Sequence, residues 1–316
     1  MVDLTRIYDK DPTLEAADEE LVRFASLEKP RPYLGMSSIG ESCSRKLWLR
    51  FRWMLRETFD AATLKRFEDG HLGEDLIVKR LQRIASVTLT HTGASQLTYS
   101  DCDGHFQGHP DGIIQGVLQA PKTPHIFEAK VCSDKKITEL KKAKFELGEK
   151  KALKKWNPVY HAQAILYMFY EGLTRHYLVA ATPGVRDWIS VRTDADNDLA
   201  KTLRSKADRI IKSQNQPEKV SEDPTWFECR MCAFAQVCHE KKLPDRNCRT
   251  CSHAEIGANG TWHCVLFKEV LSLDKQAAGC PSHVHLPSMV DGEITASTKT
   301  SVTYKLKTGE VFRDGF

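Results

Sequence analysis

The chain has 316 residues, a formal net charge of +4 and 41% hydrophobic residues, which suggests about two domains with a sizeable core and excludes global disorder. No apolar run approaches the roughly 18 residues that a membrane span needs, so no membrane partner is expected. The N-terminus, "MVDLTRIYDKDPTLEAADEE", is polar and acidic and does not resemble a signal peptide, so we expect a cytoplasmic protein.

The first third of the chain is predicted to be helical. Residues 1–35 are expected to form mainly one helix, which the prolines of "KPRP" end. Residues 37–53, "SSIGESCSRKLWLRFRW", look like a capped turn that runs into a helix rich in aromatic residues and Arg. Residues 64–84 have apolar side chains at helical spacing. Gly70 and Gly73 weaken this helix and would let another backbone or a ligand come close.

Strands and further helices follow along the chain. Segments rich in β-branched and aromatic residues predict strands at residues 86–93, 95–101, 105–118, 125–132, 176–183 and 187–193. Helices are predicted for residues 157–172 and 195–214. This order predicts an α/β fold with a mixed central sheet flanked by helices.

The composition changes near the end of the chain. From about Trp226 it is rich in cysteine, and residues 301–312 are expected to form a hairpin. We therefore predict an N-terminal helical segment over residues 1–35, a core domain over 36–240, and a small Cys-rich region with a terminal hairpin over 241–316.

The segment "GHPDGIIQGVLQAPKTPHIFEAK", residues 108–130, contains two carboxylates and a lysine. Glu128 and Lys130 lie two residues apart on a strand and therefore share a face. If the strand beside Asp111 pairs with theirs, the carboxylates and a backbone carbonyl make an oxygen cage suited to Mg²⁺ or Mn²⁺. Such a metal would polarise a phosphodiester and activate water, while Lys130 would orient that water or offset charge on the phosphate. The alternative is a hairpin with three solvated charges.

A lysine-rich segment follows this centre. Residues 135–155 contain nine Lys and three Glu, and the plain interpretation is a solvated helix face. Beside a phosphate-handling site, the same lysines would hold a nucleic-acid backbone. The candidate DNA-binding residues are Lys135, Lys136, Lys141, Lys142 and Lys144.

The order "HPDG", "FEAK", "QAILY" resembles the core of the RecB-like branch of the PD-(D/E)xK nucleases. The resemblance implies a restriction-endonuclease-like mixed sheet flanked by helices, with Asp111, Glu128 and Lys130 as catalytic residues. It also implies that Gln163 and Tyr167, which share a helix face, approach the active site. The alternative for this last pair is an ordinary half-buried helix.

The family also places a metal ligand on an early helix after a glycine. The matching stretch "EDGHLGEDL" offers Glu74, with His71 as the second choice. The resemblance therefore implies Glu74, Asp111 and Glu128 as ligands of Mg²⁺ or Mn²⁺. A simple surface glutamate on a helix is the alternative for Glu74.

Ten cysteines without a secretory signal favour metal sites over disulfides. The first cysteine set consists of Cys43 and the closely spaced Cys229, Cys232 and Cys238. One early Cys with a late C-x2-C-x5-C resembles the iron–sulfur variant of the RecB-like nucleases, which includes the CRISPR-adaptation nucleases and the AddB-type subunit. The resemblance implies a [4Fe–4S] cluster that joins the two ends of the core domain. The spacing alone suits Zn²⁺ equally well.

The second cysteine set consists of Cys248, Cys251, Cys264 and Cys280. A C-x2-C knuckle followed by two later cysteines is typical of a structural zinc site. Nearby histidines are possible substitutes, and the segment has few large apolar residues, so that a metal would replace a missing core. The family resemblance covers residues 35–240 and does not reach this set.

Together these features predict a metal-dependent DNA nuclease of the PD-(D/E)xK type from a phage or a bacterium, acting in DNA replication, recombination or repair. The Gln-x-x-x-Tyr resemblance favours an exonuclease over a sequence-specific endonuclease. DNA is the expected partner, and a helicase, a recombinase or a single-strand annealing protein are candidate protein partners. The alternatives are a non-catalytic DNA-binding or assembly subunit that keeps the fold and the cluster, and a redox or regulatory iron–sulfur protein.

Overall fold

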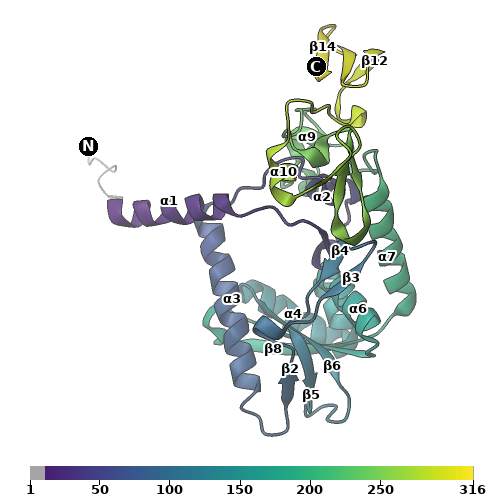
Figure 1. Ribbon diagram of the computed structural model, residues 1–316. Helices are drawn as coiled ribbons and strands as arrows, with labels where there is room; N and C mark the ends of the chain where they lie inside the picture. The colour runs from purple at the N-terminus through teal and green to yellow at the C-terminus, as the bar shows by residue number, and fades with distance from the viewer. Residues whose placement is uncertain (1–10, 316) are drawn as a thin grey trace, which may run out of the picture.

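A five-stranded mixed sheet forms the centre of the fold. The structure, a computed structural model, describes residues 11–315 (Figure 1). The strand order is β2-β5-β6-β7-β8, with β6 and β7 parallel and the other neighbours antiparallel. These strands are β2 (Thr88–Thr90), β5 (Gly112–Gln115), β6 (His125–Val131), β7 (Arg175–Ala181) and β8 (Trp188–Asp194). The mixed central sheet predicted from the sequence is thereby confirmed.

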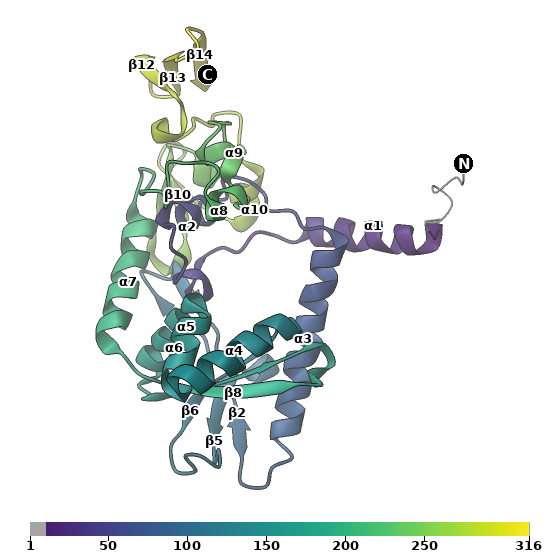
Figure 2. The same ribbon diagram turned by 180° about the vertical axis from the view of Figure 1, so that it is seen from behind.

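Helices cover both faces of this sheet. On one face, Ile77 and Leu81 of α3 pack with Phe127 and Ala129 of β6. The helices are α3 (Ala61–Leu81) on that face and α4 (Asp134–Leu147), α5 (Glu149–Trp156) and α6 (Pro158–Glu171) on the other (Figure 2). Because β6 is covered on both sides, it is mostly apolar, and its alternate residues Ile126, Glu128 and Lys130 turn away from the α3 face.

The helix boundaries have local causes. The lysine-rich segment, residues 135–155, is divided into α4 and α5 at Gly148, whose φ is 77°. The side chain of Asn157 caps α6, and Pro158 occupies its first turn. Gly172 ends α6 in the left-handed conformation, with φ 74°. These residues fix where α6 lies against β6, and hence where its polar side chains can reach.

A second group of elements packs on the far side of α6. This group shares one hydrophobic core with α6. That core includes Trp48, Phe106 and Ile210 of the group and also Trp262 of the C-terminal region. The elements of the group are β1 (Leu34–Gly35), α2 (Ser44–Phe51), β3 (Tyr99–Asp101), β4 (Phe106–Gly108) and α7 (Asn197–Lys212). Strands β1, β4 and β3 form a small sheet in that order.

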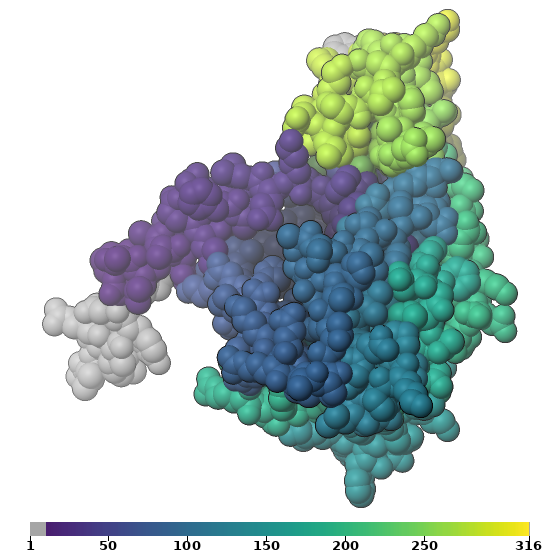
Figure 3. Space-filling view, turned by 60° about the horizontal axis from the view of Figure 1, so that its bottom comes forward, coloured from purple at the N-terminus to yellow at the C-terminus, as the bar shows by residue number. Residues whose placement is uncertain are grey.

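The N-terminal helix α1 (Pro12–Leu27) extends away from the rest of the chain and has no buried residue (Figures 1 and 2). The space-filling view shows a hollow between the segment that follows α1 and the residues of α3 and the strands after it (Figure 3). Among residues 11–315, no helix has both the length and the apolar character needed to cross a bilayer.

The C-terminal region is built from short elements. They are α8 (Phe227–Arg230), α9 (Ala235–Cys238), β9 (Ala254–Ile256), β10 (Trp262–Cys264), β11 (Glu269–Leu271), α10 (Leu273–Ala278), β12 (Gly292–Ser297), β13 (Ser301–Leu306) and β14 (Val311–Gly315). Single turns of 3₁₀ helix are η2 (Met36–Ser38), η3 (Gly93–Ser95), η4 (Pro183–Val185), η5 (Cys248–Thr250), η6 (Ala258–Gly260) and η7 (Pro287–Met289). Strands β9 to β11 form one small sheet and β12 to β14 another.

Candidate active site

Three carboxylates converge on one lysine at the edge between β5, β6 and α3. The Nζ of Lys130 lies 2.6 Å from Glu128 Oε1, 3.6 Å from Asp111 Oδ2 and 3.5 Å from Glu74 Oε1. The strand register explains part of this convergence, because Gly112 pairs with Phe127 and so brings Asp111 beside Glu128. The structure thus brings together the four charged residues that the sequence analysis selected.

Asp111 is held in place by the backbone of the neighbouring strand. Its Oδ2 accepts a hydrogen bond of 2.9 Å from the N–H of Ala129, and its Oδ1 accepts one of 3.4 Å from Gln96 Nε2. A side chain at Gly112 would meet the carbonyl oxygen of Thr90, since an added Cβ would lie 2.7 Å from it. The glycine of "HPDG" therefore lets β5 approach β2 directly after Asp111.

Glu128 is the most buried member of the group. Its Oε1 accepts a hydrogen bond of 2.8 Å from Gln163 Nε2, whereas its buried Oε2 has no hydrogen-bond partner among residues 11–315. Burial, together with the charge of Asp111, raises the pKa of Glu128 to about 8. Burial also raises the pKa of Glu74, more than Lys130 lowers it.

Lys130 keeps its proton in this environment. Burial alone would lower its pKa, but the charges of Glu128, Asp111 and Glu74 raise the pKa of Lys130 well above its usual value. Three carboxylates face one ammonium group, so the site has an excess of acidic oxygens. A divalent cation fits this donor set, because it would balance that charge and give Glu128 Oε2 a partner.

Gln163 and Tyr167 of α6 extend the polar network into the core. Gln163 Nε2 also donates to the hydroxyl of Tyr167 over 3.3 Å, and this hydroxyl accepts a second hydrogen bond of 3.2 Å from the N–H of His109. Gly108 makes room for the aromatic ring, because a Cβ there would lie 2.5 Å from Cε1 of Tyr167. Gln163 therefore points toward Glu128 on β6, and Tyr167 points toward Gly108 and His109 at the end of β4.

Sequence reasoning missed two residues of this neighbourhood. His109 lies 3.1 Å from Tyr33 Oη through Nε2 and 3.1 Å from Thr98 Oγ1 through Nδ1. The ring of Tyr160 lies 5.9 Å from Lys130 Nζ, measured to its centroid. The position of His109 beside the proline of "HPDG" was the available signal for the first, whereas nothing in the sequence marks Tyr160.

The remaining predicted residues lie outside this group. His71 is exposed on α3, one turn before Glu74. Lys141 forms an ion pair with Asp187 at 2.5 Å, and Lys144 donates to the carbonyl oxygen of Ser190 over 2.7 Å, so both are bound to β8 or the turn before it. The other pairs are Lys136 with Glu139 at 2.8 Å and Lys142 with Glu146 at 3.8 Å. Lys135 is exposed and forms no ion pair with another described residue.

The first cysteine set comes together at the start of α2. Its members, Cys43, Cys229, Cys232 and Cys238, line one cavity of about 380 Å³. The N–H of Lys46 donates to Cys43 Sγ over 3.4 Å. Gly40, three residues before Cys43, touches α6, since a Cβ there would lie 2.7 Å from Val159 Cα and 2.8 Å from Ala162 Cβ. The cysteine set is therefore in contact, through a short segment, with the helix of Gln163.

The second cysteine set lines a much smaller cavity. Its members, Cys248, Cys251, Cys264 and Cys280, surround about 20 Å³ together with His253. Burial and the neighbouring thiols raise the pKa of Cys248 to about 12. All ten cysteines of the chain are free, so neither set is paired by disulfides.

The chain was compared with known proteins. It matches no protein-family model and no curated protein. Solved structures of similar fold include that of SSO0001, with 15% identity and a TM-score of 0.42 over 72% of this chain and 96% of that chain. An alkaline exonuclease from Laribacter hongkongensis has 15% identity and a TM-score of 0.40, over 61% and 90%. A phage related exonuclease from Haemophilus somnus 129PT has 15% identity and a TM-score of 0.33, over 46% and 69%.

Proposed function

We propose that this protein is a metal-dependent DNA nuclease of the RecB-like PD-(D/E)xK type that acts as an exonuclease. The observation that carries the proposal is the convergence of Asp111, Glu128 and Glu74 on Lys130, with a buried carboxylate oxygen that lacks a partner. The Gln163–Tyr167 pair beside Glu128 supports the exonuclease assignment. The assembled acidic group counts against a non-catalytic subunit.

Each residue has a distinct proposed role. Asp111, Glu128 and Glu74 would hold Mg²⁺ or Mn²⁺, which when bound polarises a phosphodiester and lowers the pKa of a coordinated water. Lys130 keeps its proton and offsets the charge that builds on the phosphate. Gln163 fixes the rotamer of Glu128 through its 2.8 Å hydrogen bond. Tyr167 in turn orients Gln163.

The first cysteine set is proposed to hold a [4Fe–4S] cluster. Its cavity of about 380 Å³ is far larger than a single ion requires, and four thiols line it. The protein purified without oxygen is expected to be brown and to contain iron, and Cys232→Ser should lose both properties. A colourless, iron-free parent with zinc at this site would contradict the cluster without touching the nuclease assignment.

The nuclease assignment is tested with end-labelled linear DNA and circular DNA, each with and without Mn²⁺. The parent should release nucleotides from linear DNA only, and only with the metal. Asp111→Asn and Lys130→Ala should lose this activity. The matched control is Asp198→Asn, because the side chain of Asp198 on α7 is 99% exposed.

Three outcomes would contradict the proposal in whole or in part. Asp111→Asn protein that digests DNA as fast as the parent would remove the catalytic assignment. A parent that binds DNA tightly but is inert with every divalent metal would support the non-catalytic alternative. Digestion of circular DNA at a similar rate would keep the nuclease and replace the exonuclease by an endonuclease.

A further inference from the structure

Two arginines are buried between α2 and the C-terminal region. Arg52 and Arg249 are 1% and 0% exposed, respectively. Within the described part of the chain, neither guanidinium forms an ion pair with a carboxylate; their hydrogen-bond acceptors are neutral. Arg52 donates to the carbonyl oxygens of Ser213 and Arg249 and to Gln214 Oε1, at 2.9 to 3.2 Å. Arg249 donates to the carbonyl oxygens of Phe51 and Pro32 and to Gln276 Oε1, at 2.8 to 2.9 Å.

Aromatic rings enclose both cations. The guanidinium carbon of Arg249 lies 3.8 Å from the ring centroid of Trp53, and the ring of Trp262 lies 4.9 Å from Arg249 and 5.4 Å from Arg52. Such contacts recover only part of the free energy that is lost when a cation leaves water. Two like charges beside each other add to that cost. The pair therefore places two positive charges in the interior without a carboxylate partner among the described residues.

The second cysteine set is built from the same elements as the arginine pair. Arg249 stands between Cys248 and Cys251 in the C-x2-C knuckle, and Trp262 precedes Cys264 by two residues on β10. Cys248 Sγ lies 3.3 Å from the carbonyl oxygen of Lys275, which adjoins Gln276, the hydrogen-bond partner of Arg249. A single step along the backbone, from Lys275 to Gln276, therefore connects the sulfur of Cys248 with the guanidinium of Arg249.

We propose that Cys248, Cys251, Cys264 and Cys280 hold a structural Zn²⁺, and that this zinc tetrathiolate is the counter-charge of Arg249 and Arg52. Four thiolates around one Zn²⁺ carry two net negative charges, which match the two guanidinium groups. The cavity of about 20 Å³ is close to the space of one water-sized species, so it suits a single ion and excludes a cluster. The N–H of His253 already points at Cys251 Sγ over 3.4 Å, as a donor to a thiolate does.

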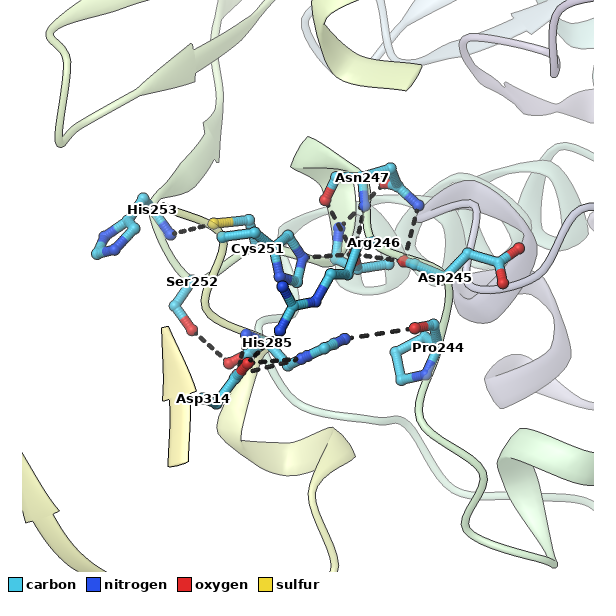
Figure 4. A network of polar contacts seen from close by, with 11 residues as sticks. Pro244, Asp245, Arg246, Asn247, Cys251, Ser252, His253, His285 and Asp314 are labelled. Carbon is cyan, nitrogen blue, oxygen red and sulfur yellow. Dashed lines mark hydrogen bonds and ion pairs between the residues drawn. The ribbon is translucent and has the colours of Figure 1, made fainter. Parts of the chain in front are cut away.

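Two of the neighbouring histidines, His283 and His285, have other partners, whereas the buried Nε2 of His253, which also lines the cavity, has no hydrogen-bond partner among the described residues. Figure 4 shows His285 between Asp314 and Pro244; its Nδ1 lies 3.1 Å from both carboxylate oxygens of Asp314, and its Nε2 lies 3.3 Å from the Pro244 carbonyl oxygen. His283 Nε2 lies 2.9 Å from Thr250 Oγ1. The ligand atoms of His283, His285 and Asp314 are within 4.8 Å of one another, but Arg246 lies 3.4 Å from Asp314 and opposes a second cation there. This group instead attaches β14 to the segment after the second cysteine set.

The zinc would fasten the C-terminal region to the end of α2. Two residues make such contacts in addition to Arg249. Asn247 Nδ2 donates a hydrogen bond of 2.8 Å to the carbonyl oxygen of Trp53. The N–H of Asp245 donates one of 2.8 Å to the carbonyl oxygen of Met54. The residues that make these contacts, Asp245, Asn247 and Arg249, lie in the C-x2-C knuckle or directly before it. Loss of the metal would therefore leave the charges of Arg52 and Arg249 without a negative counterpart. It would also weaken the packing of the C-terminal region against the end of α2.

The test measures zinc and iron in the full-length protein, purified without chelator and without oxygen. We expect one zinc ion per chain in the parent, and zinc-edge X-ray absorption should show only sulfur ligands. Cys264→Ser should lose this zinc, whereas His253→Ala and Cys232→Ser should keep it. A parent without zinc, or a nitrogen ligand in its spectrum, would overturn the tetrathiolate even if Cys264→Ser fails to fold. Zinc content is read without nuclease activity, so failure of one proposal leaves the other standing.

The counter-charge is tested by the rate at which a chelator extracts the zinc. Arg249→Met should release it about tenfold faster than the parent, the usual size of an outer-sphere effect, and Arg249→Lys should fall between the two. Arg246→Met is the control, because Arg246 is half exposed and lies beside Asp314. If Arg249→Met releases zinc as slowly as Arg246→Met, Arg249 does not compensate the negative charge of the zinc site.

Discussion

The side-chain amide of Gln163 donates a 2.8 Å hydrogen bond to Glu128 Oε1, and so links α6 to the acidic group on β6. Both side chains are buried, so water cannot replace the donor if it is removed. The position of Glu128 consequently depends on a residue 35 positions away in the sequence.

Replacing Gln163 is expected to impair the proposed nuclease without abolishing it. Gln163→Ala should lower the digestion rate about 10–100-fold, the usual cost of losing a partner of a metal ligand, and higher Mn²⁺ should restore part of the loss. Initial rates measured against Mn²⁺ concentration check this, with Gln115→Ala, an exposed glutamine at the other end of β5, as the control. An unchanged digestion rate in Gln163→Ala would show that the Gln163 side chain does not position Glu128.

Glu128 should destabilise the metal-free protein at neutral and alkaline pH. Its folded pKa of about 8 exceeds the value of about 4.3 in an unfolded chain, so the folded state binds more protons between these values. Stability should therefore fall as pH rises from about 4.3 to 8. Glu128→Gln should raise the urea midpoint at pH 8 in chelator and change it little near pH 4. Glu146→Gln, which changes an exposed residue of α4, is the control. Equal midpoints in the parent and Glu128→Gln at pH 8 would contradict the burial effect.

Metal binding should compete with the proton on Glu128. Because the carboxylate must ionise to bind a cation, the Mn²⁺ concentration that stabilises the parent should fall about tenfold for each pH unit between 6 and 8. Melting temperatures recorded in Mn²⁺ titrations at pH 6, 7 and 8 measure this shift. Asp111→Asn should show little stabilisation at any pH, and a parent with the same Mn²⁺ requirement at pH 6 and 8 would show that no proton is displaced.

Two glycines of α3, Gly70 and Gly73, can be compared to test whether close packing of α3 on β6 positions Glu74. A Cβ at Gly73 would overlap the Cγ2 methyl of Val131, whereas nothing lies within 4 Å of a Cβ at Gly70. Gly73→Ala should therefore cost about 1–3 kcal/mol of stability through overpacking, while Gly70→Ala should gain about 1 kcal/mol from helix propensity. Chemical denaturation measures both. Val131→Ala should rescue Gly73→Ala, and equal gains from the two glycine variants would refute the close approach of α3 to β6.

The lysines of α4 should contribute unequally to DNA binding. Lys135 is exposed and follows β6, which carries Glu128 and Lys130, whereas Lys141 forms an ion pair with Asp187. Lys135→Ala should weaken binding and reduce the salt dependence of the affinity by about one counter-ion. Lys141→Ala should have a smaller effect. Titrations of labelled DNA at several salt concentrations distinguish the two variants. Equal effects of both variants would mean that the ion pair between Lys141 and Asp187 breaks when DNA binds.

Local sequence patterns were enough to predict the central sheet and the charged centre. The segment "HIFEAKV" is apolar except at Glu128 and Lys130, and strand alternation alone places these two on one face. The close approach of β5 to β2 at Gly112, by contrast, became apparent only in the structure. The family resemblance was needed to predict that Glu74 joins this charged group, because helical periodicity does not indicate which turn of α3 lies closest to the sheet.

Other features depend on packing that no local pattern encodes. Lys141 and Lys144 belong to a typical solvated run in the sequence, yet they are bound at β8 because α4 lies across it. Arg52 and Arg249 are buried although arginine is mostly exposed in proteins. Their burial follows from the docking of segments about 200 residues apart, a relationship that a reading along the chain does not reveal.

The contact of Gly40 with α6 has a practical consequence for handling this protein. Cys43 follows that glycine by three positions, so damage by air to the first cysteine set would be transmitted to the helix that carries Gln163. If that set holds the proposed cluster, preparations exposed to oxygen should lose the proposed nuclease activity before they lose solubility, and specific activity should then follow the iron content of each batch rather than its protein concentration.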